Sequence, residues 1–325
     1  MNPAAWPGVR LHVVSGKGGV GKTTVAAALA LSLASGGNKV LLMEVENRQG
    51  IAQIFDTAPL PYRELKVAAA PDGGEVWALA VDPQEALLDY LEQFYNLRRA
   101  GAALKKMGAV DFATTVAPGL RDVLLTGKAC ELVRRIDRSD PNAYNAIVMD
   151  APPTGRISKF LSVNSEMSGL AKVGPIKNHA DLVMSVIASP RTAVHLVTLL
   201  EEMPVQETID GLQELADHDL PIGSVIINMT RQSMLTAEQV DAAASGSIDA
   251  RPLASVLTAA GLAADLAAPL LAETGQYAQR VQIERAERMR IAQIGRNTAE
   301  LPLIAAGIDL GALYELSALL KAQGL

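Results

Sequence analysis

A glycine-rich stretch near the N-terminus constrains the fold of this chain more than any other feature. Residues 16–24 read GKGGVGKTT, which satisfies the pattern G-x-x-x-x-G-K-[ST] of a phosphate-binding loop, or P-loop. The apolar residues 11–15 before it predict a strand, and the alanine-rich residues 25–34 after it predict a helix that stops at Gly36 and Gly37. A strand, a glycine-rich turn and a helix in this order predict an α/β fold that binds a nucleoside triphosphate.

Each residue type in the P-loop suits a task in phosphate binding. Backbone N–H groups must come close to the triphosphate oxygens, which glycine allows because it has no Cβ. The helix that follows adds free N–H donors and partial positive charge. We expect Lys22 to contact the β- and γ-phosphates, Thr23 to offer Mg²⁺ a hydroxyl oxygen, and Thr24 to lie near the α-phosphate. The predicted nucleotide-binding residues of the loop are Gly16, Lys17, Gly18, Gly19, Val20, Gly21, Lys22, Thr23 and Thr24.

A second apolar strand, at residues 146–150, ends in an acid, Asp150. In P-loop proteins a carboxylate at the end of such a strand holds Mg²⁺, usually through water. Asp150 and Thr23 are therefore the predicted magnesium ligands. Residues 152–155, with the sequence PPTG, follow directly and would form a loop that senses the γ-phosphate, although a simple turn would have the same composition.

Short β-branched segments alternate with helical ones along the chain. Several of these segments are almost continuously apolar, which is typical of strands covered on both faces, so we expect a doubly wound, mostly parallel sheet with the nucleotide at its carboxyl edge. The helical stretches at about 84–144, 157–188 and 233–294 are expected as insertions into a single P-loop domain spanning 1–325, where they would form a small α-helical subdomain. The expected strands are 10–15, 39–45, 76–81, 145–150, 193–198, 222–228 and 301–304.

Composition and charge argue against several classes of protein. The formal net charge of −6 argues against a nucleic-acid binder, which should carry a basic patch. A single cysteine, Cys130, allows no disulfide framework and no cysteine metal site within one chain, which fits a reducing, cytoplasmic location. The window 253–272 is apolar but contains Asp265, Gly261 and Pro269, so it predicts short helices and no stable membrane span.

The P-loop with its second lysine, Lys17, and the stretch DAPPTGR at 150–156 resemble the deviant Walker A ATPases. The similarity is greatest to the branch that contains the arsenite-pump ATPase ArsA and the tail-anchored-protein targeting ATPase. It implies a Mg²⁺-dependent ATPase that works as a homodimer, or as a heterodimer with a paralogous subunit, and that acts on a protein client or partner. Further similar stretches, which extend the resemblance over most of the chain, are 79–86, 118–120, 198–208, 226–228 and 301–303.

The resemblance also implies roles for single residues. Lys17 would reach the nucleotide of the partner subunit, and Asn228 would hydrogen-bond adenine. Glu46 stands where the family has the aspartate that positions the attacking water, and its extra methylene predicts slow turnover because a misplacement of about 1 Å can cost on the order of 100-fold in rate. The plain alternatives are a solvated lysine, a strand-end asparagine and a surface acid. The predicted catalytic residues are Lys17, Lys22 and Glu46.

Other departures from the family leave alternatives open. The targeting branch holds its dimer with a C-x-x-C zinc site that has no counterpart here, so a zinc-clamped dimer is not expected. In the pump branch arsenite is bound by cysteine thiolates, so the single cysteine argues against arsenite as a ligand. A nucleotide-dependent scaffold with little turnover is one alternative function, and a membrane-surface ATPase of the MinD/ParA kind is another.

Overall fold

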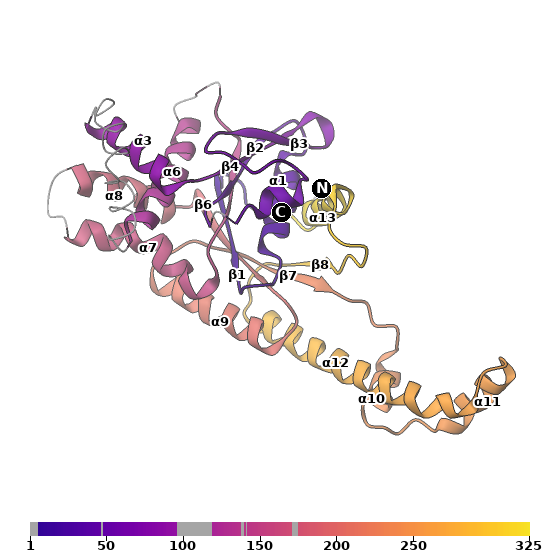
Figure 1. The fold of residues 1–325 in the computed structure, drawn as a ribbon. Coiled ribbons are helices and arrows are strands. Elements are labelled where there is room, and N and C mark those ends of the chain that lie inside the picture. Colours follow the sequence, from indigo (N-terminus) through magenta and orange to yellow (C-terminus); the bar gives the residue numbers. More distant parts are fainter. Residues whose placement is uncertain (1–5, 47, 96–118, 138–139, 141, 171–174) are drawn as a thin grey trace.

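The structure is a computed structural model that describes residues 6–46, 48–95, 119–137, 140, 142–170 and 175–325. Its core is an eight-stranded sheet with the order β3-β4-β2-β5-β1-β6-β7-β8 (Figure 1). Every neighbouring pair is parallel except β3 and β4, which pair antiparallel at one edge. The strands are β1 (Leu11–Gly16), β2 (Lys39–Glu44), β3 (Leu65–Ala69), β4 (Glu75–Ala80), β5 (Ala146–Asp150), β6 (Thr192–Thr198), β7 (Ile222–Thr230) and β8 (Thr298–Pro302).

Helices cover both faces of this sheet, which confirms the doubly wound, mostly parallel α/β fold. One apolar cluster joins β-strand side chains such as Val14 and Leu42 to helices α1 and α13, and the other joins Val13 and Met43 to helices on the opposite face, among them α6, α7 and α9. The helices are α1 (Lys22–Ala34), α2 (Gly50–Ile54), α3 (Pro83–Tyr95), α6 (Leu120–Asp137), α7 (Thr154–Leu170), α8 (Pro175–Ile187), α9 (Glu202–Asp217), α10 (Ala237–Ala244), α11 (Ala250–Ala259), α12 (Ala267–Gln293) and α13 (Leu310–Ala322).

The central strands lie close to their expected positions, but the two edges of the sheet differ from the prediction. The expected strand 301–304 is wrong in its bounds, because β8 runs from Thr298 to Pro302 and alternates between exposed and buried residues. The edge strand β3 was not expected, since most of its five residues are at least partly exposed and its sequence LKVAA lacks an apolar run. Edge strands bury few side chains, so their sequences carry a weak signal.

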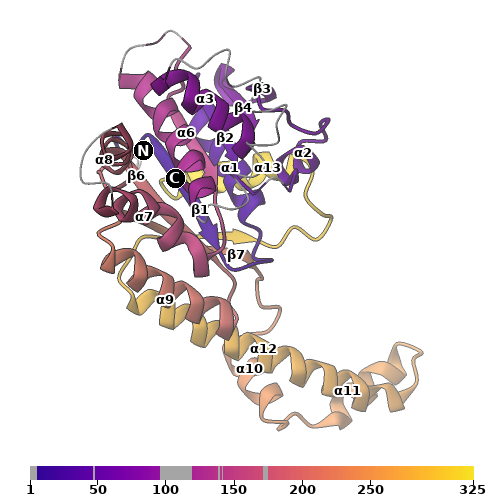
Figure 2. The ribbon, with the colours of Figure 1, turned by 60° about the vertical axis from the view of Figure 1, so that its left-hand side comes forward.

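The helices between the strands form two groups. Helices α3, α6, α7 and α8 gather beside β4, β5 and β6. Helices α10, α11 and α12, which come between β7 and β8 in the chain, form an arm that extends away from the sheet (Figures 1 and 2). Residues 96–118, in the first expected insertion, lie outside the described residues. In the part of the chain that the structure describes, no helix combines the length and hydropathy needed to cross a bilayer. The assignment of residues 1–325 to a single domain stays a prediction.

Candidate nucleotide-binding site

The P-loop connects the central strand β1 to helix α1, and two of its glycines are required by the geometry. Gly21 has φ +86°, and a Cβ at this position would lie 2.4 Å from Nδ2 of Asn228. A Cβ at Gly16 would lie 2.3 Å from the carbonyl oxygen of Val197 on β6. A Cβ at Gly16 would clash with the backbone, and one at Gly21 would displace the Asn228 amide at a positive φ that favours glycine, so the shape of the loop depends on both glycines.

Asn228 holds the P-loop through a contact that the sequence did not predict. Its buried side-chain amide donates from Nδ2 to the carbonyl oxygen of Val20, at 2.9 Å. An asparagine amide has two N–H donors and a carbonyl acceptor, so one donor and the acceptor remain for a ligand. The expected adenine contact stays a prediction, but Asn228 lies next to the loop that would bind the phosphates.

The carboxyl ends of β2 and β5 and the start of α1 enclose a cavity of about 40 Å³. It brings together four predicted site residues that are far apart in the sequence, namely Lys22, Thr23, Glu46 and Asp150. Parallel strands direct their carboxyl ends to one edge of a sheet, which is why these residues meet. The full lining is Lys22, Thr23, Glu44, Glu46, Arg48, Gly50 and Asp150.

Thr23 and Asp150 form an oxygen pair suited to a small, hard cation. The Thr23 hydroxyl donates to Oδ2 of Asp150 at 2.6 Å. Burial raises the pKa of Asp150 to about 6, and the nearby carboxylates of Glu44 and Glu46 act in the same direction, against the Thr23 hydrogen bond and the charge of Lys22. A buried carboxylate that resists ionisation gains from a cation beside it, so the donor set fits Mg²⁺.

Lys22 enters the same cavity from the first turn of α1. Its side chain is almost fully buried, and burial lowers its pKa while the charges of Asp150 and Glu46 favour the protonated form. An ammonium group surrounded by carboxylates and held at a helix N-terminus is placed to attract phosphate oxygens.

Two residues at the end of β2 and in the loop after it were missed by the sequence reasoning. The buried carboxylate of Glu44 accepts hydrogen bonds from the backbone N–H groups of Gln49 and Ile51, so it fixes the course of this loop. Arg48 forms an ion pair with Glu46 at 3.4 Å. The sequence contained a signal for Glu44, because an acid that ends an apolar strand needs buried donors. The role of Glu46 in positioning water stays a prediction.

Lys17 lies outside the cavity, on the side of helix α9. Its Nζ is 2.8 Å from Oε1 of Glu207, and both side chains are about one-third exposed, at 30% and 35%. The second oxygen of Glu207 accepts a hydrogen bond of 3.4 Å from the hydroxyl of Thr154, at the start of α7. Lys17 is therefore ion-paired within its own chain, and Glu207 connects it to the predicted γ-phosphate-sensing loop.

The N-terminal turn of α6 contacts the loop after β2 and the first turn of α7. Arg121 donates to the carbonyl oxygen of Val45, at 3.3 Å, and Asp122 pairs with Arg156 at 3.4 Å. Arg156 stands where the resemblance gives a histidine. A movement of the loop after β2 or of the first turn of α7 would therefore change the contacts of α6.

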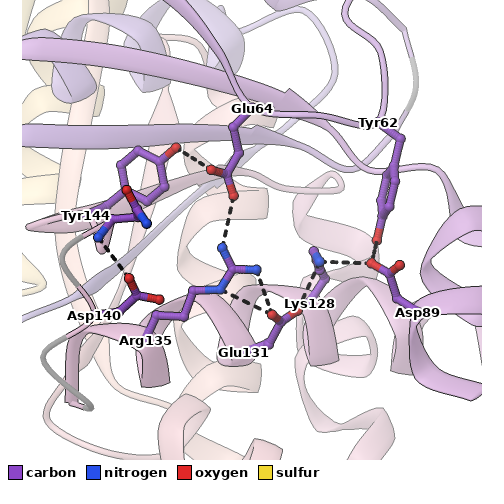
Figure 3. Close-up of polar contacts among 9 residues, drawn as sticks. Tyr62, Glu64, Asp89, Lys128, Glu131, Arg135, Asp140 and Tyr144 are labelled. Carbon is purple, nitrogen blue, oxygen red and sulfur yellow. Dashed lines mark hydrogen bonds and ion pairs between the residues drawn. The ribbon is translucent and has the colours of Figure 1, made fainter. Parts of the chain in front are cut away.

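A second set of contacts joins the loop after β2 to the helices. Gln49 exchanges two hydrogen bonds with the backbone of Leu60, and the segment that follows carries Tyr62 and Glu64. Figure 3 shows the hydrogen bonds that Tyr62 makes with Asp89 of α3, and Glu64 with Arg135 of α6. The network is completed by Lys128, Glu131 and Tyr144.

Cys130 is a small buried side chain, as the sequence predicts. It lies on α6, its thiol contacts the carbonyl oxygen of Val183 at 3.6 Å, and burial raises its pKa to about 12. A neutral, enclosed thiol is a poor ligand for a soft metal or metalloid. Within the described residues no group of three or more His, Cys, Asp or Glu side chains is arranged to hold a metal ion.

A family model described as anion-transporting ATPase matches residues 9–189, which include the P-loop, the loop after β2 and Asp150. The chain belongs to the anion-transporting ATPase family. This membership confirms the resemblance drawn from the motifs and assigns the chain to the enzymes that hydrolyse ATP.

Curated relatives extend the similarity over the rest of the chain. The ATPase BagA of Mycobacterium tuberculosis is 54% identical over 327 residues, which cover 99% of this chain and 95% of the relative. An arsenical pump-driving ATPase of Acidiphilium multivorum is 28% identical and covers 66% of this chain and 38% of the relative. The ATPase GET3 of Kluyveromyces lactis is 26% identical and covers 66% of this chain and 70% of the relative.

Proposed function

We propose that this ATPase works as a dimer in which two protomers close around bound ATP and each places Lys17 beside the nucleotide of the other. The observation that supports this most directly is the position of Lys17. Lys22 already lies in the cavity with Thr23 and Asp150, whereas Lys17 is paired with Glu207 outside it. A second loop cation on the outer side of the site suits the phosphates of a neighbouring protomer better than those of its own.

The cavity residues suggest how each would act in hydrolysis. The N–H groups of the P-loop and Lys22 would bind and orient the triphosphate, and Thr23 with Asp150 would hold Mg²⁺. When bound there, Mg²⁺ would supply positive charge that helps to neutralise the triphosphate. Glu46 would accept a hydrogen bond from the attacking water, and the Lys17 ammonium of the partner would stabilise the charge that develops.

The proposed output is a change of shape that acts on a protein client or partner. The dimer would be a homodimer or a heterodimer with a paralogous subunit, in a cytoplasmic location. One relative is named an arsenical pump-driving ATPase. Cys130 is buried and neutral, so we propose no arsenical ligand for this chain.

The ion pair between Glu46 and Arg48 favours a second candidate function, a nucleotide-dependent scaffold with little turnover. The glutamate is longer than the family aspartate, and one of its carboxylate oxygens is already paired with Arg48 at 3.4 Å, so it has less freedom to orient water. A steady-state turnover that is unchanged by Glu46→Ala would support the scaffold.

Sedimentation velocity with and without Mg²⁺ and ATP tests the proposed function. We expect ATP to convert monomers to dimers in the chain with Glu46→Ala, in which hydrolysis is slowed, and capture of bound proteins by this variant would identify the client. The control is the chain with Lys22→Ala alone, which lacks the lysine expected to contact the triphosphate and should stay monomeric. A protein that stays monomeric with saturating ATP, alone and with each paralogue, would contradict the proposal.

A further inference from the structure

We infer that the base of the arm carries a second anion-binding site that takes a phosphate dianion. At this point helix α12 passes beside the segment that leaves β7, and the two enclose a cavity of about 90 Å³. No residue of the P-loop lines it. We call the cavity the arginine pocket, and the side chains that define it are Arg231, Ser233, Tyr277, Arg280, Arg285 and Arg288.

The charges around the arginine pocket do not balance. Arg288 makes a two-pronged contact with Glu300, at 2.8 and 3.0 Å, and Arg231 pairs more loosely with Glu284 at 3.6 Å. Arg280 and Arg285 make no ion pair with any residue that the structure describes. Two of four guanidinium groups are thus unneutralised, which leaves a net charge of about +2 at the pocket. The whole chain, by contrast, has a net charge of −6.

The side chains of the pocket come from two ordered elements. On α12, Tyr277, Arg280, Glu284 and Arg288 follow one another at intervals of three and four residues, so they lie along one face of the helix. The opposite wall is fixed because the hydroxyl of Tyr277 accepts a hydrogen bond of 3.0 Å from the backbone N–H of Met234. Arginine stays charged at any physiological pH, so the repulsion among these groups persists unless an anion enters.

Charge and geometry favour phosphate over other anions. A dianion neutralises the excess of about two positive charges, whereas a single carboxylate neutralises half of it. Guanidinium groups from the segment after β7 and from α12 match the tetrahedral oxygens of phosphate. The anion could be free phosphate or the phosphate of a nucleotide, and the two share this chemistry.

The pocket lies next to the nucleotide site without being part of it. Arg231 directly follows β7, the strand that carries Asn228, and a neighbouring cavity of about 80 Å³ is lined by both residues and by Glu284. The ion pair between Arg231 and Glu284 therefore forms a wall shared by the two spaces. This inference does not depend on the dimer proposed above.

Calorimetric titration of the full chain with inorganic phosphate tests the site, at constant ionic strength because exposed charges are screened by salt. Binding of phosphate at the P-loop is prevented in one series by Lys22→Ala. In a second series it is prevented by saturating the wild-type chain with Mg²⁺ and ADP. We expect phosphate binding to remain in both series and to weaken by about 10-fold or more when Arg280→Ala and Arg285→Ala are combined. Arg296→Ala, an exposed arginine near the end of α12 and outside the pocket, is the matched control and should leave the affinity unchanged.

Further measurements identify the source of the phosphate. Competition by ATP in the chain with Lys22→Ala would assign the site to a nucleotide phosphate, and no competition would assign it to free phosphate. Binding that disappears with Lys22→Ala and with ADP, or that the paired arginine substitution leaves intact, would overturn the inference. Displacement of phosphate by a polyglutamate peptide at lower concentration than by pyrophosphate would also overturn it, because the pocket would then recognise an acidic protein segment.

Discussion

The substitution Lys17→Ala separates a catalytic role for this lysine from a structural one. The ion pair that it breaks, with Glu207, has a distance of 2.8 Å and side chains that are 30% and 35% exposed. Pairs with this exposure contribute about 0–1 kcal/mol to the free energy of unfolding, so the melting temperature should fall by about 2 °C or less. A cation that stabilises a transferred phosphoryl group is worth far more, and we expect kcat for ATP hydrolysis to fall by about 100- to 1,000-fold, or ~3–4 kcal/mol in the transition state.

The matched control is Glu207→Gln, which removes the same ion pair but leaves the lysine. Both variants should show the same small loss of stability by urea unfolding, and only Lys17→Ala should lose turnover in a phosphate-release assay. Equal parts of Lys17→Ala and Glu46→Ala protomers test whether the lysine acts across the dimer, because Glu46→Ala is expected to bind ATP and dimerise while its own site turns over slowly. Random pairing in a homodimer gives one complete site in half of the dimers, so about a quarter of the wild-type rate should return. Equal losses in Lys17→Ala and Glu207→Gln, or no recovery on mixing, would refute the reasoning.

Three further predictions address the loop, the metal ligands and the core. Asp150→Asn keeps the shape of the side chain but removes its charge, so the Mg²⁺ concentration for half-maximal turnover should rise by about 10-fold or more, measured by magnesium titration. Gly21→Ala meets both a positive φ and a Cβ contact of 2.4 Å, and should weaken ATP binding and cost about 1–3 kcal/mol in stability, whereas Gly18→Ala, with open space around its Cβ, should fold normally. Burial lowers the pKa of His12 to about 4, and His195, 3.1 Å away, is lowered as well. Because the unfolded chain takes up protons below pH 6.5 that the folded core does not, the free energy of unfolding by urea should fall from pH 6.5 toward pH 4 by up to about 3 kcal/mol more in the wild-type chain than in His12→Gln. The comparison with His12→Gln is needed because Asp150, with its raised pKa, favours the folded chain as the pH falls over the same range; identical pH profiles for the two chains would contradict the assignment.

The parts of the fold that the sequence predicted well are those formed by consecutive residues of the chain. The P-loop is such a case, because the strand, the glycines, Lys22 and Thr23 follow one another directly. The central strands were also predicted closely, since strands buried on both faces need long apolar runs. The edge strand β3 lacked such a run, and the bounds of β8 were misplaced for the same reason.

The parts that the sequence did not predict depend on contacts between distant segments. The hydrogen bond from Asn228 to Val20 spans 208 residues. The pairing of Lys17 with Glu207, and the excess of arginines where α12 meets the end of β7, likewise appear only once the sheet has assembled. Unlike these contacts, the role of Glu44 had a signal in the local sequence, because an acid at the end of an apolar strand implies buried donors. The family resemblance pointed to Glu46 and not to Glu44.

The order of the strands explains why the two lysines of the P-loop have different surroundings. Strands β5 and β2 lie on one side of β1, and their carboxyl ends bring Asp150 and Glu44 to Lys22. Strand β6 lies on the other side of β1, and the helix that follows it brings Glu207 to Lys17. The two cations are thus divided between opposite halves of the same sheet edge, with the loop between them. Because the two lysines have different neighbours, we expect that neither restores the activity lost when the other is replaced by alanine.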